Sequence, residues 1–416
     1  MAAPARVILG VAGGIAAYKA CELLRRLTET GHDVRVVPTA SALRFVGEAT
    51  WAALSRHPVA TDVWGDAHEV PHVAIGQSAD LVVVAPATAD LLARAAHGLA
   101  DDLLTNVLLT ARCPIVLVPA MHTEMWEHPA TAENVATLRG RGVIVLDPAV
   151  GRLTGTDSGR GRLPEPEEIF AVLERVMRRR TQSPALSTGR HRPAADLAGR
   201  RVVVTAGGTR EPLDPVRYLG NRSSGKQGYA LAGTAVARGA EVVLISANVT
   251  LPEPAGVTLI RVGTTEELRK ATLDAAADAD AVVMAAAPAD FRPAEYAPEK
   301  IRKADNGDPP VLRLVTNPDI AAELGERRRD GQILVAFAAE TGGTDVALAN
   351  ARAKLDRKRA DLIVVNEVGV DKVFGQETNA ITVLGADGSL TELAEAPKTE
   401  IADAIWDLVA ARLPPT

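Results

Sequence analysis

Residues 201–228 read RVVVTAGGTREPLDPVRYLGNRSSGKQG, and this stretch is the strongest indication of fold in the chain. The apolar run Val202–Val204 predicts a buried strand that ends in a glycine turn, and a second glycine–serine turn opens a helix. Glycines let the backbone approach phosphate oxygens, and the first turn of a helix presents unpaired N–H groups. Four positive charges lie in the same stretch, on Arg210, Arg217, Arg222 and Lys226. The stretch therefore predicts a strand–loop–helix unit that binds a small molecule carrying phosphate and carboxylate groups.

The composition bounds the class of protein. The chain has 416 residues, more than one hydrophobic core ordinarily supports, so two domains are expected. Hydrophobic residues make up 47% of the chain and the mean hydropathy is near zero, as in globular proteins. A net charge of −6 argues against a nucleic-acid-binding surface over the whole molecule, and the basic groups are instead concentrated in particular loops.

Cysteine usage and hydropathy indicate the compartment. Cys21 and Cys113 are too few for a disulfide framework or a cysteine-based zinc site, so we expect the reducing cytoplasm. The apolar run Val7–Tyr18 is interrupted by glycines and continues as a patterned helix, which argues against a secretion signal. No apolar stretch reaches the roughly 18 residues that a membrane span requires, and no membrane association is expected.

Strands and helices alternate along the first half. Apolar runs predict buried strands at Val7–Val11, Val34–Val37, Leu81–Ala85 and Ile115–Val118. After the first of these runs, apolar residues recur with the spacing of one helix face, at Ala20, Leu23, Leu24 and Leu27. Strands that are hydrophobic on both faces and separated by helices predict a parallel sheet with helices on both sides.

The same alternation restarts after residue 200. Further strands are predicted at Arg201–Thr205, Val242–Ser246, Ala281–Ala285, Ile333–Ala336 and Leu362–Val365. A hairpin that includes Ala380–Leu384 and turns at Asp387-Gly388, and a closing helix at Ile401–Leu413, complete the chain. Residues 178–195 are rich in Arg, Ser, Thr and Pro and hold no apolar stripe, which indicates a linker, with a surface loop as the alternative. We predict an α/β protein with two Rossmann-like domains on parallel sheets, at residues 1–180 and 198–416, joined by a linker at 181–197.

Small and polar residues follow the predicted strands of the first half. They are Gly13 and Gly14 after the first strand, Thr39 after the second, Pro86–Ala89 after the third and Ala120 after the fourth. Ligands of open α/β sheets bind at this edge. A glycine turn alone is more often a packing feature, so the prediction of a ligand site depends on all four strand ends together.

Several segments of the first half resemble the flavin-containing cysteine decarboxylases over residues 5–175. They are GVAGGIAAYK, the histidine of Pro71-His72-Val73, APATAD, GLADDLLTN and PAMHTEMWEHP. The resemblance implies that FMN binds against the strand ends, accepts hydride from a cysteinyl substrate so that CO₂ leaves, and then returns the hydride. The FMN contacts that it implies are Gly13, Gly14, Thr39, Pro86, Ala87, Thr88, Ala89 and Ala120.

The resemblance also assigns substrate-handling residues. His72 matches the active-site histidine, and an imidazole that titrates near neutrality suits proton transfer. Met125 matches a residue that shapes the substrate pocket, although core packing is the alternative. His122 stands where the family usually has an asparagine that contacts the substrate carboxylate, and an imidazole can donate a similar hydrogen bond.

The flap is a second departure from that family. Its proton-donating cysteine is missing, because the chain reads Thr154-Gly155-Thr156-Asp157 where the family has a Cys-Gly-Asp element. We expect Thr156, Asp157 or water to donate the proton instead. The alternative is an active ligase fused to a catalytically impaired flavin-binding domain.

Residues 198–412 resemble the nucleotide-dependent phosphopantothenate–cysteine ligases of coenzyme A biosynthesis, on the opening stretch and on AAAPADF, PEKI, NPDI and AFAAET. The resemblance implies that Asn221 handles an acyl-cytidylate, that Lys300 neutralises phosphate charge and that Arg217 binds phosphate or carboxylate. In isolation these would be a turn asparagine and solvated cations. The CTP contacts that it implies are Ala286, Ala287, Asp290, Lys300, Pro318, Asp319, Ile320, Ala321, Phe337, Lys354 and Lys358.

Together the two resemblances imply a bifunctional enzyme. It would join 4′-phosphopantothenate to L-cysteine with CTP and Mg²⁺, and then decarboxylate the product with FMN. They also imply trimers through the flavin domain and dimers through the ligase domain, combining to a homo-oligomeric dodecamer. Charge and spacing alone do not separate CTP from ATP, and they predict no metal ligands. A nucleotide- or flavin-sensing regulator is the alternative from another class, whereas an NAD dehydrogenase lacks its G-x-G-x-x-G fingerprint here.

Overall fold

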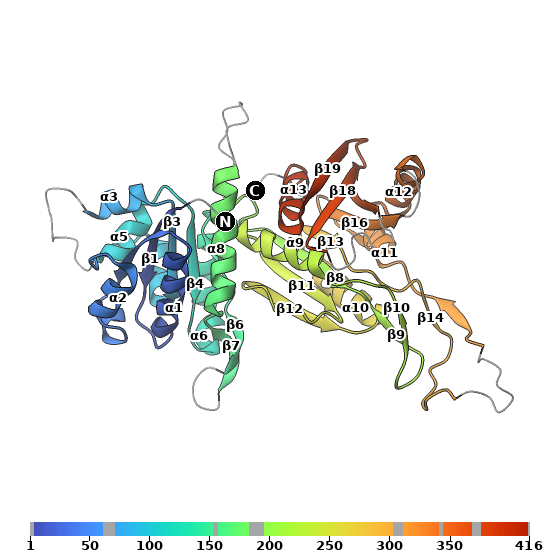
Figure 1. Ribbon diagram of the computed structural model, residues 1–416, viewed down its shortest axis with the longest axis horizontal. Helices are drawn as coiled ribbons and strands as arrows, with labels where there is room; N and C mark the ends of the chain where they lie inside the picture. Colours follow the sequence, from blue (N-terminus) through green and yellow to red (C-terminus); the bar gives the residue numbers. More distant parts are fainter. Residues whose placement is uncertain are drawn as a thin grey trace. The chain divides into compact units, whose positions relative to one another are not determined.

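The computed structural model describes residues 4–60, 71–152, 157–182, 195–302, 311–340, 344–367 and 376–414. Contacts divide the chain into two compact units, and Figure 1 labels most of their helices and strands. The N-terminal unit comprises Met1–Gly199, Val236–Glu241 and Pro254–Val257, and the C-terminal unit comprises Arg200–Ala235, Val242–Glu253 and Thr258–Thr416. Each unit has its own sheet.

The N-terminal unit alternates strands and helices as predicted. Its strands are β1 (Arg6–Val11), β2 (Asp33–Pro38), β3 (Leu81–Ala87), β4 (Ile115–Pro119), β5 (Ile144–Val145), β6 (Ala149–Arg152) and β7 (Ser158–Arg162). Its helices are α1 (Ala17–Glu29), the 3₁₀ helix η1 (Ala42–Arg44), α2 (Glu48–Ser55), α3 (Pro71–Ser78), α4 (Ala89–His97), α5 (Leu103–Thr110), α6 (Thr123–Trp126), α7 (Pro129–Gly140) and α8 (Pro166–Gln182). Helix α8 runs two residues into the predicted linker, most of which lies outside the described residues.

The sheet of the N-terminal unit has the order β2-β1-β3-β4-β5, and all of its pairings are parallel. The predicted stripe of α1 is buried, because Leu23, Leu24 and Leu27 pack inward. Leu91 and Leu104, from α4 and α5, join a core cluster with strand residues of the sheet. The strand order reverses between β1 and β3, which is the point where an open α/β sheet offers a ligand site.

The C-terminal unit carries the second sheet. Its strands are β8 (Arg201–Gly207), β9 (Arg210–Pro212), β10 (Tyr218–Gly220), β11 (Glu241–Ala247), β12 (Val257–Val262), β13 (Ala281–Met284), β14 (Phe291–Pro293), β15 (Leu314–Thr316), β16 (Ile333–Glu340), β17 (Leu362–Glu367), β18 (Thr378–Gly385) and β19 (Leu390–Pro397). Its helices are α9 (Lys226–Ala237), α10 (Thr265–Ala276), α11 (Ile320–Arg327), α12 (Thr344–Lys358) and α13 (Lys398–Ala410).

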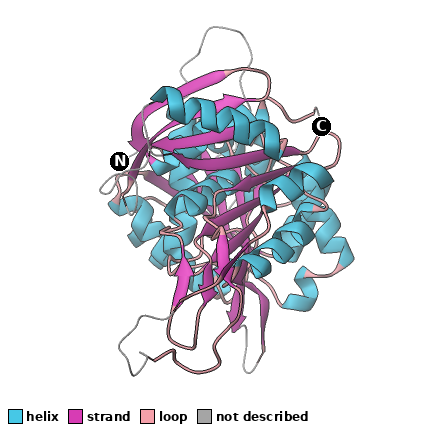
Figure 2. Ribbon diagram, turned by 90° about the vertical axis from the view of Figure 1, so that its right-hand side faces the viewer, coloured by secondary structure: helices cyan, strands magenta, loops and turns pink. Residues whose placement is uncertain are grey.

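The large sheet of this unit has the order β12-β11-β8-β13-β16-β17-β18-β19. Its first six strands, taken in chain order, follow the 3-2-1-4-5-6 pattern of the Rossmann fold. The last two form the predicted antiparallel hairpin, which turns at Asp387-Gly388. Figure 2 shows the strands among the helices. The strand orders confirm the prediction of two Rossmann-like α/β domains on parallel sheets.

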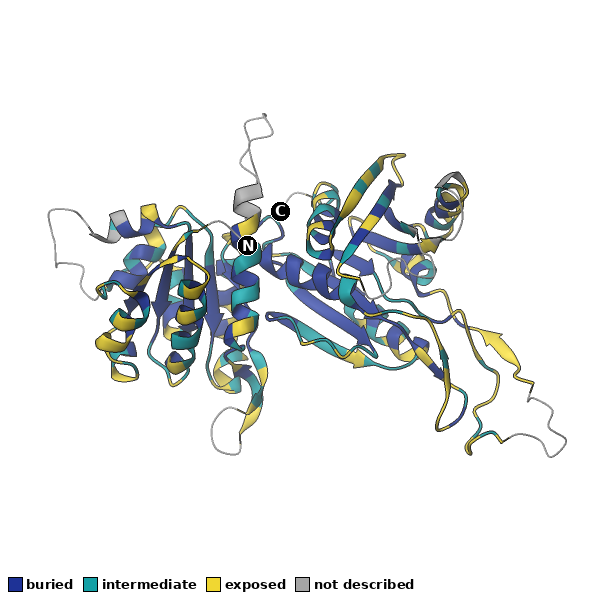
Figure 3. Cartoon of the chain, in the orientation of Figure 1, coloured by how far each residue is buried: buried dark blue, intermediate teal, exposed yellow. Residues whose placement is uncertain are grey.

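Burial follows the sheets (Figure 3). In the C-terminal unit, residues of β8, β11, β13 and β16 form one core cluster with Leu268 of α10, Leu324 of α11 and Leu355 of α12. Trp406 of α13 is fully buried, and its Nε1 donates a hydrogen bond to the Leu231 carbonyl at 2.9 Å. The antiparallel ribbon β14–β15, in contrast, is largely exposed. Within the described part of the chain, no helix is both long enough and apolar enough to cross a membrane.

Candidate functional site

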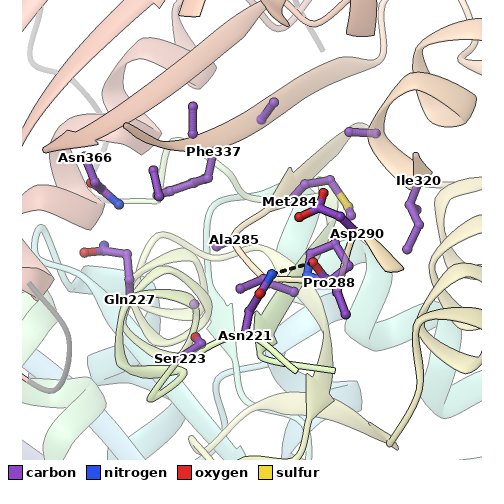
Figure 4. A pocket seen from close by; sticks show the side chains of 18 of the residues that line it. Asn221, Ser223, Gln227, Met284, Ala285, Pro288, Asp290, Ile320, Phe337 and Asn366 are labelled. Carbon is purple, nitrogen blue, oxygen red and sulfur yellow. Dashed lines mark hydrogen bonds between the residues drawn. The ribbon is translucent and has the colours of Figure 1, made fainter. Parts of the chain in front are cut away.

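A cavity of about 610 Å³ lies at the carboxyl-terminal edge of the C-terminal sheet (Figure 4). Its walls are the start of α9, the segment after β13, the start of α11, one side of α12 and the ends of β16 and β17. The fold thereby brings together residues that are more than 130 positions apart in the sequence. The predicted residues that line the cavity are Asn221, Ala286, Ala287, Asp290, Asp319, Ile320, Ala321, Phe337, Lys354 and Lys358.

Asn221 is held against the segment that follows β13. Its Nδ2 donates a hydrogen bond to the carbonyl oxygen of Pro288 at 2.8 Å, drawn as a dashed line in Figure 4. The approach of the backbone requires a glycine at position 208, since a Cβ there would lie 2.6 Å from the carbonyl oxygen of Asn221. The orientation of this amide therefore depends on the position of Pro288.

A network of buried polar side chains holds the segment that follows β13 in place. Thr209 Oγ1 accepts a hydrogen bond from Ala289 N at 2.8 Å, and Asn317 Nδ2 donates to Ala289 O at the same distance. Thr265 N and Oγ1 both donate to Glu211 Oε1, at 2.9 and 2.8 Å. Because a carboxylate only accepts, Thr265 Oγ1 must itself accept from Thr209, at 2.9 Å, and from Asn317, at 3.3 Å. These four side chains are at most 9% exposed, and no sequence motif predicts the network that they form.

Charged groups at the start of α11 and on α12 form an ion pair in the wall of the cavity. Lys358 Nζ donates to both carboxylate oxygens of Asp319, at 2.6 and 2.8 Å, and Asp319 also caps α11 by accepting from Ala322 N. Burial opposes ionisation of Asp319, but the hydrogen bonds and charge of Lys358 outweigh it, so the pKa of that carboxyl lies below its usual value. Lys354 and Lys358 both face the cavity, as their spacing of four on one helix predicts.

Arg217 and Lys300 lie elsewhere. Neither lines this cavity, and both adjoin the buried carboxylate of Asp214. Arg217 donates to Asp214 through its backbone and its guanidinium, and Ile301 N, next to Lys300, donates to the same carboxylate. The Arg217 guanidinium holds the pKa of Asp214 well below its usual range. Their roles stay predictions, as does that of Pro318, which precedes the cavity residue Asp319 without lining the cavity.

Further polar residues line the cavity that were not predicted from the sequence. Gln227, Asn366, Asn379 and Lys398 line the same cavity. Asn379 Nδ2 donates to Asn366 Oδ1 at 3.1 Å, which joins β18 to β17. Lys398 is 7% exposed, burial lowers its pKa, and its Nζ donates to the carbonyls of Gln376 and Thr378. Gln227 stands in the glycine–serine turn of the opening stretch, whereas no short motif surrounds Asn366, Asn379 or Lys398, which only the fold reveals.

In the N-terminal unit, the carboxyl ends of four strands are tied together. The backbone hydrogen bonds run from Ala12 N to Pro86 O (3.1 Å), from Thr39 N to Val11 O (2.9 Å) and from Ala120 N to Ala87 O (3.1 Å). A Cβ at Gly13 would lie 2.3 Å from that of Ser41, so the turn after β1 needs a glycine. Thr88 Oγ1 accepts from Leu91 N and caps α4. The predicted segments at Gly13, Gly14 and Pro86–Ala89 thus lie at the strand-order switch, an arrangement that suits a flavin carrying a phosphate.

The segment predicted to be a flap, at residues 154–157, falls in the sequence between β6 and β7, which pair as an antiparallel hairpin, and its residues 154–156 lie outside the described residues. The stem of this hairpin packs on the segment that carries His122, because Met121 N donates to Gly161 O at 3.0 Å and a Cβ at Gly159 would lie 2.3 Å from Thr123 Oγ1. His122 begins α6 as its N-cap residue.

The remaining predicted residues of this half are placed only in part. Met125 is 47% exposed, and Asp157 is exposed just before β7. His72 is the second residue of α3, and its side chain lies outside the described residues. Thr156 lies outside them altogether.

Two family models match the chain and together cover most of it. Residues 1–178 match the family described as Flavoprotein, and residues 197–413 match the DNA/pantothenate metabolism flavoprotein C-terminal domain. Each match contains one of the two sheet edges described above.

Relatives match over almost the whole length. The coenzyme A biosynthesis bifunctional protein CoaBC of Mycolicibacterium smegmatis is 56% identical over 420 residues, covering 99% of this chain and 99% of the relative. The protein of the same name from Bacillus subtilis is 41% identical, covering 97% and 96%. The crystal structure of the C-terminal domain of a coenzyme A biosynthesis bifunctional protein CoaBC matches with 35% identity and a TM-score of 0.44, covering 52% of this chain and 97% of that one.

Proposed function

The chain belongs to the family of bifunctional coenzyme A biosynthesis proteins CoaBC, and from this premise we propose the reaction of each half. As a member, it combines a flavoprotein decarboxylase domain with a ligase domain. The C-terminal unit joins 4′-phosphopantothenate to L-cysteine through an acyl-cytidylate, releasing pyrophosphate and CMP from CTP. The N-terminal unit decarboxylates the resulting 4′-phosphopantothenoylcysteine to 4′-phosphopantetheine with FMN.

The position of Asn221 carries the ligase proposal. Its amide lies in a cavity whose lining also includes Lys354, Lys358 and the first turn of α9. In the first step a carboxylate oxygen of the acid attacks the α-phosphorus of CTP, and the bond to pyrophosphate breaks. In the second step the cysteine amine attacks the acyl carbon, loses a proton and expels CMP. Asn221 can hydrogen-bond the intermediate in both steps without reacting itself.

Cations support the triphosphate in this proposal. Lys354 and Lys358 bind phosphate oxygens from α12, and the N–H groups at the start of α9 offer further donors. Asp290 is the carboxylate in the cavity lining that would help to hold Mg²⁺, and the ion would neutralise part of the triphosphate charge. Lys300 reaches the phosphates from the segment that Asp214 anchors.

Backbone hydrogen bonds connect the carboxyl ends of the strands in the N-terminal unit, and small residues line this edge of the sheet where the strand order reverses. This arrangement supports the flavin proposal. FMN bound there would supply reversible oxidation of the cysteinyl group, which makes the loss of CO₂ easy. His72 moves the proton, His122 binds the substrate carboxylate, and Met125 shapes the pocket. The N–H groups of the first turn of α4 face the same edge and can bind the FMN phosphate.

Thr156, Asp157 or water supplies the proton that the family's flap cysteine would give. The alternative of an impaired flavin domain is not favoured, since relatives named as bifunctional match this chain along both halves. A Thr156→Val variant that turns over at the wild-type rate would remove Thr156 from this role.

The proposal also includes a cellular compartment and an oligomeric state. We place the enzyme in the cytoplasm, on the basis of its cysteine usage. Homo-oligomers, up to a dodecamer of trimers and dimers, are expected from the family resemblance. Apolar side chains at Val311, Leu312 and Leu314, which are 92%, 47% and 47% exposed, support self-association of the ligase half.

Three measurements on the purified full-length chain test this proposal. A visible flavin absorption spectrum tests the cofactor, CTP-dependent pyrophosphate release with 4′-phosphopantothenate and cysteine tests the ligase, and CO₂ release from 4′-phosphopantothenoylcysteine tests the decarboxylase. We expect all three signals. A yellow protein without CO₂ release would restore the impaired-domain alternative, and an absence of pyrophosphate would refute the ligase assignment.

A further inference from the structure

One end of the large cavity carries polar side chains that the ligase chemistry proposed above does not use. Asn366 lies near the end of β17, Asn379 lies in β18 and Lys398 begins α13. All three line the cavity, and we call them the amide–lysine cluster. In Figure 4, Asn366 lies on one side of the cavity and Ile320 on the other, with Asn221 between them. The cluster therefore lies away from the α11 wall, which holds predicted CTP contacts.

Hydrogen bonds fix the orientation of these side chains. Lys398 Nζ donates to the carbonyl of Thr378 at 3.0 Å and to that of Gln376. Asn379, the residue after Thr378, is 3% exposed, and its Nδ2 donates to Asn366 Oδ1 at 3.1 Å. The oxygen of Asn366 is thus taken up inside the cluster. Its Nδ2 has no acceptor in the described part of the chain, so this donor is available to a ligand in the cavity.

The charge of the cluster indicates the kind of ligand. Lys398 is 7% exposed, and among the described residues no carboxylate forms an ion pair with it. Glu377, which lies close in sequence to Asn379, pairs with Lys226 instead. Two of the three ammonium N–H groups of Lys398 reach carbonyls, which leaves one beside the amide donors of Asn366. A buried cation without an ion pair favours an anionic ligand, and one ammonium with one amide suits a carboxylate better than a triphosphate.

Two amide oxygens at this end also lack partners. Asn379 Oδ1 and Gln227 Oε1 are buried and accept no hydrogen bond from the described residues. Gln227 adjoins the cluster, because its Nε2 donates to the Lys398 carbonyl at 3.3 Å. Buried amide oxygens are nearly always paired, so the cluster is incomplete by itself. An α-amino acid, which carries an amine beside its carboxylate, offers both an acceptor for the donors and N–H groups for the oxygens.

We propose that the amide–lysine cluster binds L-cysteine, the second substrate of the ligase, with its α-carboxylate at Lys398 and Asn366. The amine is thereby directed towards the acyl carbon held at Asn221. The inference rests on the proposed function and names the residues that select the amine. Asn379 is a positioning residue, because it acts through Asn366. The acid substrate is the other source of a carboxylate, and the experiment separates the two.

Two amines test the assignment: L-cysteine, and cysteamine, which lacks the carboxylate. Pyrophosphate release with CTP and 4′-phosphopantothenate gives kcat/KM for each amine. Asn366→Asp keeps the shape of the side chain and the acceptor for Asn379, but it replaces the free donor with a carboxylate oxygen. We expect the ratio of kcat/KM for L-cysteine to kcat/KM for cysteamine to fall about 10- to 100-fold, through a higher KM for L-cysteine.

Three further variants extend the test. Lys398→Met should lower the same ratio, and Lys398→Arg, which keeps the charge, should recover part of it. Asn379→Leu should lower the ratio by a smaller factor, because it removes only the contact that orients Asn366. Asn350→Asp is the matched control, since this asparagine of α12 is exposed and lies outside the cavity lining, and it should keep the wild-type ratio.

The exchange of labelled pyrophosphate into CTP, with 4′-phosphopantothenate and without cysteine, reports the first step alone. We expect wild-type exchange in Asn366→Asp and Lys398→Met. An unchanged ratio with normal exchange would overturn the cysteine subsite and leave the proposed function standing. A loss of exchange would assign the cluster to the acid or to CTP and would also overturn it. A wild type with neither exchange nor pyrophosphate release would refute the proposed function, and the subsite with it. Thermal unfolding of every variant controls for loss of the fold, and Asn366→Asp decides the question if Lys398→Met does not fold.

Discussion

Thr209→Val is the substitution that tests the buried network most sharply. Valine matches the shape of threonine, so no cavity forms, but the acceptor for the Ala289 N–H is lost at a position that is fully buried. A buried donor without a partner costs about 1–3 kcal/mol, and we expect the free energy of unfolding of the ligase half to fall by that amount. Chemical denaturation of the full chain, followed through the C-terminal transition, measures it.

The same change should slow catalysis. If the Ala289 peptide shifts, the neighbouring carbonyl of Pro288 no longer holds the amide of Asn221. We expect kcat for CTP-dependent pyrophosphate release to fall about tenfold, which corresponds to about 1.4 kcal/mol of transition-state stabilisation. In an Asn221→Ala background the effect of Thr209→Val on kcat should largely disappear, since the two residues act through one contact.

Two control variants make this prediction refutable. Thr209→Ser keeps the oxygen and loses one methyl group, so it should cost about 0.8 kcal/mol of stability and retain kcat. Thr272→Val makes the same change at another fully buried threonine, whose hydroxyl, among the described residues, donates only to the Leu268 carbonyl of its own helix. If Thr209→Val matched Thr272→Val in both stability and kcat, the reasoning would be wrong.

Two further predictions concern other parts of the molecule. Gly13→Ala places a Cβ 2.3 Å from that of Ser41, so we expect this variant to bind less flavin, measured by absorption, and to melt at a lower temperature. Gly140→Ala is the control, because a Cβ there has nothing within 4 Å, and it should keep the flavin content and the melting temperature of the wild type. Equal flavin content and equal melting temperatures in the two variants would contradict the prediction. In the fold the pKa of Asp319 is lowered, so its ionised form adds stability at neutral pH that is lost as pH falls through the folded-state pKa. Lys358→Met should therefore lower the free energy of unfolding by up to about 1 kcal/mol at neutral pH, and by progressively less below about pH 4. Urea unfolding at several pH values measures this. A loss of stability that does not depend on pH would argue against the ion pair between Lys358 and Asp319.

The sheets could be predicted because their strands are apolar on both faces. Continuous runs such as Val202–Val204 have few alternatives once helices with a clear stripe separate them. Strand β5, only two residues long, gives no such signal. The three-residue strands of the ribbons β9–β10 and β14–β15 are partly exposed and include prolines, so no period of two emerges from the sequence.

The candidate site was predictable where short motifs follow strands, and not where partners are distant in sequence. Asn221 and Asp290 stand in motifs, and the fold brings both to one cavity. Thr209 and Thr265 are 56 positions apart, and their hydrogen bond depends on how the loops after β8 and before α10 meet. Arg217 has the expected chemistry, but an aspartate three residues before it takes up its guanidinium. Such pairings depend on backbone geometry that composition does not encode.

The transfer of oxygen from the acid to CMP tests the central claim most directly. 4′-Phosphopantothenate labelled with ¹⁸O in its carboxyl group is turned over with CTP and cysteine, and the products are examined by mass spectrometry. If the C-terminal unit activates the acid as an acyl-cytidylate, each CMP will carry one labelled oxygen and pyrophosphate will carry none. Unlabelled CMP, or label in any other phosphate product, would contradict the account.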